Sequence, residues 1–252
     1  MLLELAGVSR RFGGLAAVAD LSMTVAEGAI HGLIGPNGAG KSTVFNLVSG
    51  VLPVSAGAIR FRQAPITGLT PAEICRRGIA RTFQATTVFR EYTVRQNLLV
   101  AAQPRVNDGT LAALFRLRDY REREEAAVAR TGELLSTLHL DLIADRMVAG
   151  LPHRDQKALS VGMALATGAT LLLLDEPLAG LTLAETREVM DLLRTVRAGG
   201  ITVLLVEHDM RAVMDLCDRI TVLDHGTRIA EGTPREIQTD PAVIEAYLGA
   251  EA

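Results

Sequence analysis

Short apolar runs separated by turn residues predict a chain in which strands and helices alternate. Residues 30–34, 171–174 and 201–206 are mostly apolar, as strands buried on both faces of a parallel sheet must be. Residues 185–197 instead place apolar side chains three or four positions apart and are followed by Gly199 and Gly200, which predicts an amphipathic helix. This order is typical of an α/β core.

Two further regions have a different character. Residues 2–8, 21–25 and 57–61 read as strands of a small antiparallel sheet, and residues 219–223 and 227–230 as a hairpin. A short helix over 71–78 leads to a strand over 79–84, and the chain closes with a helix over 240–248. Helical spacing dominates from 94 to 149, where the charged run 119–125 fits a solvated helix face. We therefore expect a helical insertion in the core.

A glycine-rich loop after the strand at 30–34 carries the clearest chemical signal. It fits the pattern G-x-x-x-x-G-K-[ST], in which backbone N–H groups form a concave nest for phosphate. The Lys41 ammonium would reach the β- and γ-phosphates, the Ser42 hydroxyl would bind Mg²⁺, and a helix over 43–48 would point its positive end at the phosphates. The residues of this candidate nucleotide site are Gly35, Pro36, Asn37, Gly38, Ala39, Gly40, Lys41, Ser42 and Thr43.

Acidic residues follow a second buried strand. Four leucines over 171–174 lead to Asp175 and Glu176, at the strand end where open parallel sheets bind ligands. Asp175 would hold Mg²⁺ and Glu176 would polarise a water molecule, although a Glu-Pro pair also commonly starts a helix. His208 follows the strand at 201–206, and there it would act as a phosphate-sensing donor.

Composition excludes several classes of function. The net charge of −3 shows no basic footprint for nucleic acid, and Cys75 and Cys217 form no metal or redox motif. No signal peptide is visible, and the longest apolar runs are far shorter than the roughly 20 residues that span a bilayer. We expect a cytoplasmic chain of one domain whose membrane role, if any, comes through a partner.

Phe12 stands between two arginines and two glycines near the start of the chain. Its ring would stack on an adenine base or, equally well, pack as an ordinary hydrophobic side chain on the small antiparallel sheet.

The order of these motifs resembles the ATP-binding cassette (ABC) family of transporter ATPases, over essentially the whole chain. The likeness is greatest to the ATP-binding subunits of branched-chain amino-acid uptake systems, through residues 11–15, 80–84, 231–234 and 245–249. The resemblance implies a P-loop NTPase (RecA-like) core with an antiparallel β subdomain and a helical insertion subdomain. As a single ABC domain over 1–252, it would divide into a core at 1–84 and 166–252 and a helical subdomain at 85–165.

The same resemblance assigns roles to single residues. Phe12 becomes the adenine-stacking aromatic, and Gln84 links Mg²⁺ and water to the membrane partner. Asp175 matches the Mg²⁺ ligand, Glu176 the catalytic glutamate and His208 the γ-phosphate contact. The implied cofactors are ATP and Mg²⁺.

One motif departs from the family. At the expected spacing before Asp175, the signature loop that usually reads Leu-Ser-x-Gly-Gln is replaced by Leu151, Pro152, His153, Arg154, Asp155 and Gln156. The family's two cassettes bind head to tail, so that each signature loop closes the partner's ATP site. Arg154 at the glycine position adds bulk where backbone must approach phosphate, although its guanidinium could still pair with phosphate. A heterodimer with a second ATP-binding subunit is therefore expected.

These signals predict the ATP-hydrolysing motor subunit of a membrane importer. It would lie on the inner face of the plasma membrane, bound to integral-membrane permeases near Gln84 and residues 89–92, and bind no nucleic acid. Three alternatives stay open: a nucleotide-dependent regulatory module with low turnover because of Arg154, a soluble ABC protein without a membrane partner, and a small-molecule kinase.

Overall fold

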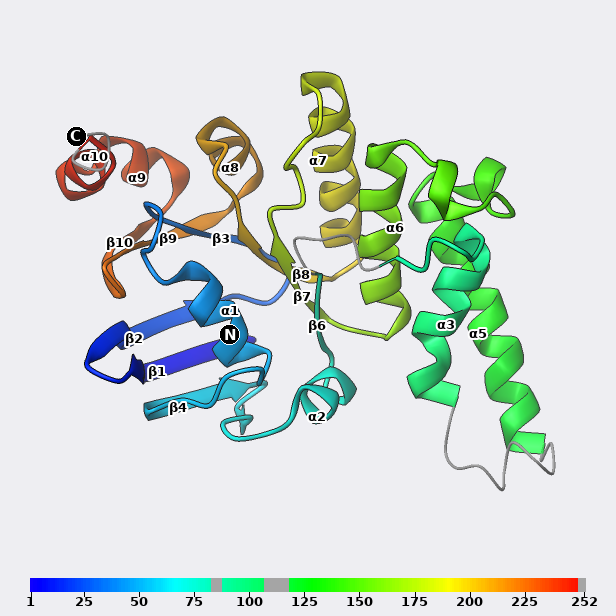
Figure 1. Ribbon diagram of the computed structural model, residues 1–252, viewed down its shortest axis with the longest axis horizontal. Coiled ribbons are helices and arrows are strands. Elements are labelled where there is room, and N and C mark those ends of the chain that lie inside the picture. The colour runs from blue at the N-terminus through cyan, green and yellow to red at the C-terminus, as the bar shows by residue number, and fades with distance from the viewer. Residues whose placement is uncertain (83–87, 107–117, 249–252) are drawn as a thin grey trace.

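The computed structural model describes residues 1–82, 88–106 and 118–248, which form two sheets flanked by helices (Figure 1). The larger sheet has the strand order β10-β9-β3-β8-β7-β6, parallel except for the β9–β10 hairpin. Its strands are β3 (Ile30–Ile34), β6 (Ile79–Arg81), β7 (Leu171–Asp175), β8 (Thr202–Val206), β9 (Arg219–Asp224) and β10 (Thr227–Gly232). The smaller sheet is antiparallel, in the order β2-β1-β4-β5, with strands β1 (Leu3–Phe12), β2 (Leu15–Val25), β4 (Ala56–Phe61) and β5 (Ala64–Pro65).

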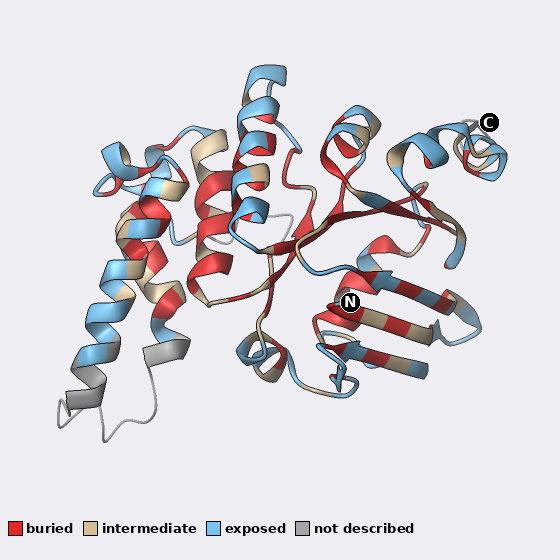
Figure 2. Ribbon diagram, turned by 180° about the vertical axis from the view of Figure 1, so that it is seen from behind, coloured by how far each residue is buried: buried red, intermediate tan, exposed pale blue. Residues whose placement is uncertain are grey.

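The central strands of the larger sheet, β3, β7 and β8, are buried on both faces. Leu171 and Leu173 pack into a core shared with the antiparallel sheet, whereas Leu172 and Leu174 pack into the core on the opposite face. Successive side chains of a strand point to opposite faces, so one run of leucines fills both cores. Figure 2 shows the central strands as continuously buried ribbons, in contrast to the banded strands of the smaller sheet.

Helices cover the two faces unequally. Helix α1 (Lys41–Val48) lies between the two sheets, where Phe45 is fully buried. On the other face lie α6 (His153–Ala166), α7 (Leu183–Ala198) and α8 (Met210–Leu216). Helices α3 (Val94–Val106) and α5 (Arg118–Thr137) pack beside α6 at one end of the molecule. Between α5 and α6 lie two short 3₁₀ turns, Asp141–Ile143 and Val148–Gly150. The remaining helices are α2 (Pro71–Arg76), α9 (Pro234–Thr239) and α10 (Pro241–Leu248).

Threonine caps decide where several helices begin. Thr182 accepts a hydrogen bond from the backbone N–H of Glu185, whose carboxylate accepts one from the N–H of Thr182. This capping box starts α7 at Leu183, two residues before the predicted start at 185. The same box, built on Thr233 and Glu236, starts α9, which the sequence analysis did not predict.

The larger sheet, the smaller antiparallel sheet and the helices beside them confirm the predicted fold class. The first hairpin is longer than predicted, because β1 runs to Phe12 and β2 begins at Leu15 around the turn at Gly13 and Gly14. Strand β6 ends at Arg81, and Gln84 lies outside the described residues.

Candidate functional site

The glycine-rich loop joins β3 to α1, and three of its glycines, Gly35, Gly38 and Gly40, hold positive φ angles. Gly35 has φ 149°, and a Cβ there would collide with the carbonyl oxygen of Leu223. Gly40 has φ 100°, and a Cβ there would lie 2.5 Å from the carbonyl oxygen of Ala17. Both positions therefore require glycine, which lets the loop turn tightly and start α1 at Lys41.

The loop forms one wall of a cavity of about 330 Å³. Residues 37–43, Glu176 and His208 line it, and Ala17 and Val206 complete the lining. Of the predicted nucleotide-site residues, Gly35 and Pro36 lie behind this wall, where Lys41 contacts them. The structure thus brings together one strand end from each of β3, β7 and β8, as expected at the carboxyl edge of a parallel sheet.

Lys41 is the buried cation of the cavity. Its ammonium donates hydrogen bonds to the carbonyl oxygens of Gly35 (2.7 Å) and Pro36 (2.9 Å). Burial lowers the pKa of Lys41, and the nearby carboxylates of Glu176 and Asp175 oppose that shift. Ser42, the next residue, is exposed at the cavity wall. The site therefore presents a cation and a hydroxyl at the start of α1, as phosphate binding requires.

Glu176 and His208 form a direct pair. The His208 ring nitrogen Nε2 lies 2.8 Å from the Glu176 carboxylate oxygen Oε1. Glu176 has φ 49°, an unfavourable angle for a residue with a side chain, and its N–H donates to the Val206 carbonyl oxygen at 2.9 Å. The glutamate is thus held in a strained conformation that turns it into the cavity beside His208.

Asp175 is buried at the end of β7 and pairs with an arginine. The Arg81 guanidinium lies 2.9 Å from the Asp175 carboxylate, and both side chains are 9% exposed. The same guanidinium donates to the Asn46 side-chain oxygen at 2.6 Å and lies 5.5 Å from the centre of the Phe45 ring. Arg81 therefore ties Asp175 to α1. No role for Arg81 follows from the sequence, because no local pattern reveals a contact across 94 residues.

Phe12 lies at the tip of the first hairpin rather than in the lining of the cavity. Its ring is 45% exposed, and the Arg10 guanidinium lies 4.7 Å from its centre. Ala17 from the same hairpin does line the cavity. Of the two readings of Phe12, its exposure disfavours the hydrophobic plug.

The signature segment begins α6, away from the cavity. Leu151 is buried and accepts a hydrogen bond from the Gln156 side chain at 2.8 Å, while Pro152 is the N-cap residue of the helix. The Arg154 guanidinium lies 2.9 Å from the Asp155 carboxylate and 3.0 Å from that of Glu188 on α7. None of these residues lines the 330 Å³ cavity. His153, the first residue of α6, lies near Gly180 after β7.

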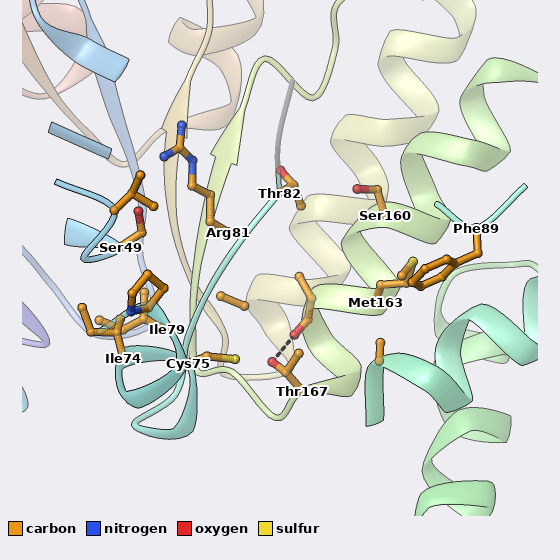
Figure 3. Close-up of a pocket in the computed structure, with 15 residues that line it drawn as sticks. Ser49, Ile74, Cys75, Ile79, Arg81, Thr82, Phe89, Ser160, Met163 and Thr167 are labelled. Atoms are coloured by element: carbon orange, nitrogen blue, oxygen red, sulfur yellow. Dashed lines mark hydrogen bonds between the residues drawn. The ribbon is translucent and has the colours of Figure 1, made fainter. Parts of the chain in front are cut away.

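A second cavity, of about 370 Å³, lies between α2, β6 and α6 (Figure 3). Its lining is largely apolar and includes Ile74, Ile79, Phe89 and Met163. Phe89 is 48% exposed, and its ring centre lies 5.5 Å from that of Tyr92, which is 43% exposed. In Figure 3 the Phe89 ring lies against Met163, at the far end of the cavity from Ser49. This face is suited to contact with another protein.

Comparison with known proteins gives a family for this arrangement. A family model described as "ABC transporter" matches residues 18–179, and one described as "Branched-chain amino acid ATP-binding cassette transporter" matches residues 227–252. The high-affinity branched-chain amino acid transport ATP-binding protein LivG of Salmonella typhimurium is 42% identical over 249 residues, which cover 98% of both chains. Its counterpart BraF of Pseudomonas aeruginosa is 40% identical over the same share of both chains.

A solved structure extends the likeness to the whole fold. The ADP conformation of MJ1267, an ATP-binding cassette of an ABC transporter, matches with a TM-score of 0.86 and 32% identity over 98% of both chains. The family expected from the sequence motifs is thereby confirmed. The chain belongs to the ATP-binding cassette family of transporter ATPases, which hydrolyse ATP to power transport.

Proposed function

We propose that this chain is the motor subunit of an importer for branched-chain amino acids or similar small polar solutes. The observation that carries the proposal is the cavity in which the phosphate loop meets the Glu176–His208 pair. The cargo rests on the relatives, since LivG and BraF, at 40–42% identity, are described as branched-chain amino acid transport proteins.

Each residue of the cavity then has a role in ATP hydrolysis. The loop amides and Lys41 bind the β- and γ-phosphates, and Lys41 leaves the carbonyl groups of Gly35 and Pro36 to do so. Glu176 orients the attacking water and accepts its proton. His208, within hydrogen-bond distance of Glu176, holds that carboxylate and faces the γ-phosphate. By the family resemblance, Phe12 stacks on the adenine base, and Gln84 links Mg²⁺ and water to the membrane partner.

The donor atoms present also fit Mg²⁺. Ser42 offers a hydroxyl and Asp175 a carboxylate, and hard cations prefer such oxygen ligands. Mg²⁺ keeps several waters and takes the rest of its shell from substrate phosphates, so a protein cage of acids is not needed. The ion would neutralise charge on the phosphate oxygens. The ion pair of Asp175 with Arg81 orients the carboxylate from behind.

A second ATP-binding subunit with an intact signature loop is the proposed partner at this site. Arg154 stands where the family has glycine, and its guanidinium is turned to Asp155 and Glu188 of its own chain. The start of α6 is thus already engaged by its own side chains and poorly suited to close a partner's phosphate site. This favours a heterodimer in which only the site built on Lys41 and Glu176 is fully active.

Permease subunits are the proposed membrane partners. In the described ranges 1–82, 88–106 and 118–248, no helix is both long and apolar enough to cross a bilayer. We assign the permease contact to the 370 Å³ cavity with the exposed Phe89 and Tyr92 rings, which lies on β6 next to Gln84 in sequence. The chain would then sit on the inner face of the plasma membrane as one domain, with residues 85–165 as its helical subdomain.

One other function is favoured by a specific observation. Arg154 also suits a regulatory module that binds ATP and hardly hydrolyses it. The paired Glu176 and His208 side chains argue against that reading, since a site without turnover needs neither.

Reconstitution in vesicles tests the proposal. The chain, purified with its permeases and second cassette, is sealed in proteoliposomes with ATP inside, and uptake of labelled leucine is measured. We expect ATP-dependent uptake that Lys41→Ala abolishes. If ATP hydrolysis drives uptake of an amide or urea instead of leucine, the proposed cargo is wrong but the role as a motor subunit stands. ATP binding without hydrolysis would favour the regulatory module.

A further inference from the structure

Lysine is rare in this chain. One of its two lysines lines the cavity of the phosphate loop, and the other contacts the backbone of a residue that lines it. Of the 26 lysine and arginine residues, two are lysines, Lys41 and Lys157. Lys157 lies on α6 with 7% of its surface exposed. Its ammonium donates a hydrogen bond to the backbone carbonyl oxygen of Glu176 at 3.1 Å. A buried cation thus reaches the backbone of the residue proposed to orient the water.

The Glu176 backbone needs such support. Its φ of 49° is unfavourable for a residue with a side chain and persists only where the surroundings fix it. Its N–H donates to the Val206 carbonyl oxygen, and its carbonyl oxygen accepts from both Lys157 and the Ala179 N–H (3.2 Å). Without Lys157, the carbonyl would lose a cationic donor, and the angle at which the carboxylate enters the cavity would be less well defined.

Glu207, the residue that follows β8, supports the same pair. It is 4% exposed, and its two carboxylate oxygens accept from the N–H groups of Leu178 (2.7 Å) and His208 (3.2 Å). One buried carboxylate therefore joins the turn after Glu176 to the residue that pairs with it. Its hydrogen bonds fix the spacing between the two strand ends that carry the pair.

Burial shifts the pKa values of both supporting side chains. Burial lowers the pKa of Lys157, and the charges of Glu207 and Glu176 oppose that shift. Burial raises the pKa of Glu207, and its backbone hydrogen bonds oppose it. Apolar side chains of similar volume would often serve stability as well as buried charged groups. The retention of two buried charges behind the cavity therefore calls for a role beyond packing.

We propose that Lys157 and Glu207 are positioning residues that hold Glu176 and His208 in their reactive arrangement. Lys157 lies three residues after Arg154, one turn along α6. Residues three apart on a helix are neighbours on its surface. A shift of the signature segment on meeting a second cassette would thus be carried through Lys157 to the Glu176 backbone. This inference rests on the proposed role of Glu176.

Substitutions in the assembled complex test the inference. Lys157→Met keeps the length of the side chain and removes the ammonium, whereas Lys157→Arg keeps a cationic donor. Glu207→Gln keeps an acceptor for Leu178 but removes the charge. Arg235→Met, on the exposed surface of α9, is the matched control for loss of a cation. For each variant, kcat and KM for ATP, ATP affinity and the melting temperature are measured.

We expect Lys157→Met and Glu207→Gln to lower kcat about 10-fold or more, because small misplacements of catalytic groups cost rate rather than binding. KM and ATP affinity should stay within about twofold of wild type, and Lys157→Arg should recover most of the lost kcat. The Arg235→Met control should match wild type.

Two results would overturn the inference. One is an unchanged kcat in Lys157→Met. The other is an equal loss in Lys157→Met and Lys157→Arg together with a lower melting temperature, which would make Lys157 a packing residue. Glu176→Gln, measured in parallel, separates failure of the proposed role of Glu176 from failure of the positioning role of Lys157. If that variant still hydrolyses ATP, the proposed role of Glu176 fails. If it is inactive while Lys157→Met is normal, the positioning role alone fails.

Discussion

Helices α1 and α6 both begin without a side-chain cap, but the side chains of their first turns differ. Helices α2, α7, α8 and α9 begin at a Thr or Asp side chain that caps their first N–H groups. Helices α1 and α6 begin at Gly40 and Pro152, and neither has a side-chain cap. An uncapped helix start leaves N–H groups for a ligand, and a phosphate is a suitable one.

The side chains of the first turn make the difference. Helix α1 opens with Lys41 and Ser42 at a cavity and has no acidic residue in its first turn. The first turn of α6 contains Asp155, and Arg154 bridges that carboxylate to Glu188. An uncapped helix start thus serves an anion only where its own side chains leave the approach open. Four predictions test this contrast, from the largest expected effect to the smallest.

ATP hydrolysis in the cavity at the start of α1 depends first on Glu176, which lines that cavity. Glu176→Gln keeps the size of the side chain and a hydrogen bond to His208 but removes the base. We expect kcat for ATP hydrolysis to fall about 100-fold or more, which corresponds to roughly 3 kcal/mol in the barrier. ATP affinity, measured with a fluorescent nucleotide analogue, should change little. If the variant keeps more than a tenth of wild-type turnover, the catalytic base must be a different residue.

Gly40→Ala tests the backbone of the α1 start. The new Cβ would meet the Ala17 carbonyl oxygen at a positive φ, so we expect a loss of about 3 kcal/mol in the free energy of unfolding. ATP binding should weaken as well. Gly14→Ala is the control, because a Cβ there has open space. Equal urea midpoints for the two variants would contradict the role given to Gly40.

His31 makes the strand that leads into α1 sensitive to acid. Burial lowers the pKa of His31 from 6.5 to about 4, and its ring bonds Thr221 at 2.8 Å. The unfolded chain therefore binds this proton first, and stability falls as pH drops from about 6.5 towards 4. Between pH 7 and pH 5 we expect His31 to account for a loss of about 2 kcal/mol. Urea unfolding of wild type and His31→Gln at both pH values measures it, since other groups cancel in the difference. An equal acid loss in both proteins would contradict this prediction.

Arg154→Gly tests the α6 side of the contrast. Removing the side chain opens the first turn of α6 to a partner's phosphate. Because one of the two sites is already active, we expect a restored second site to raise turnover of the assembled complex about twofold. Glu188→Gln breaks one ion pair and leaves the guanidinium in place, so its turnover should stay near wild type. If Arg154→Gly leaves turnover unchanged, the idea of an impaired second site fails.

The sequence predicted what local patterns determine. The apolar run before Gly35 and the leucines before Asp175 identified β3 and β7, and with them the two strand ends that meet at the cavity. Helices α8 and α9 were missed although local signals were present. Asp209 caps α8, and the Thr233–Glu236 capping box starts α9. Both helices are short, and apolar periodicity alone does not reveal helices of this length.

The supporting contacts could not have been predicted from any local pattern. Arg81 meets Asp175, and Glu207 meets the Leu178 N–H, across 94 and 29 residues of sequence. A lone arginine on a strand or a lone glutamate before a histidine carries no signal of its own, because its partner is chosen by the packing of the sheet. The rarity of lysine was the one visible pointer to Lys157.

The ion pair of Arg81 also has a consequence for the edge of the sheet. Strand β6 has three residues and pairs with β7 through Ile79↔Leu171, Ala80↔Leu172 and Arg81↔Leu173. Such a short edge strand has few hydrogen bonds to define its alignment, and a shift by one residue would turn every side chain to the other face. Arg81 would then enter the apolar core under α6. The ion pair of Arg81 with Asp175 forms only in the observed alignment of β6 against β7. It therefore favours that alignment over one shifted by a residue.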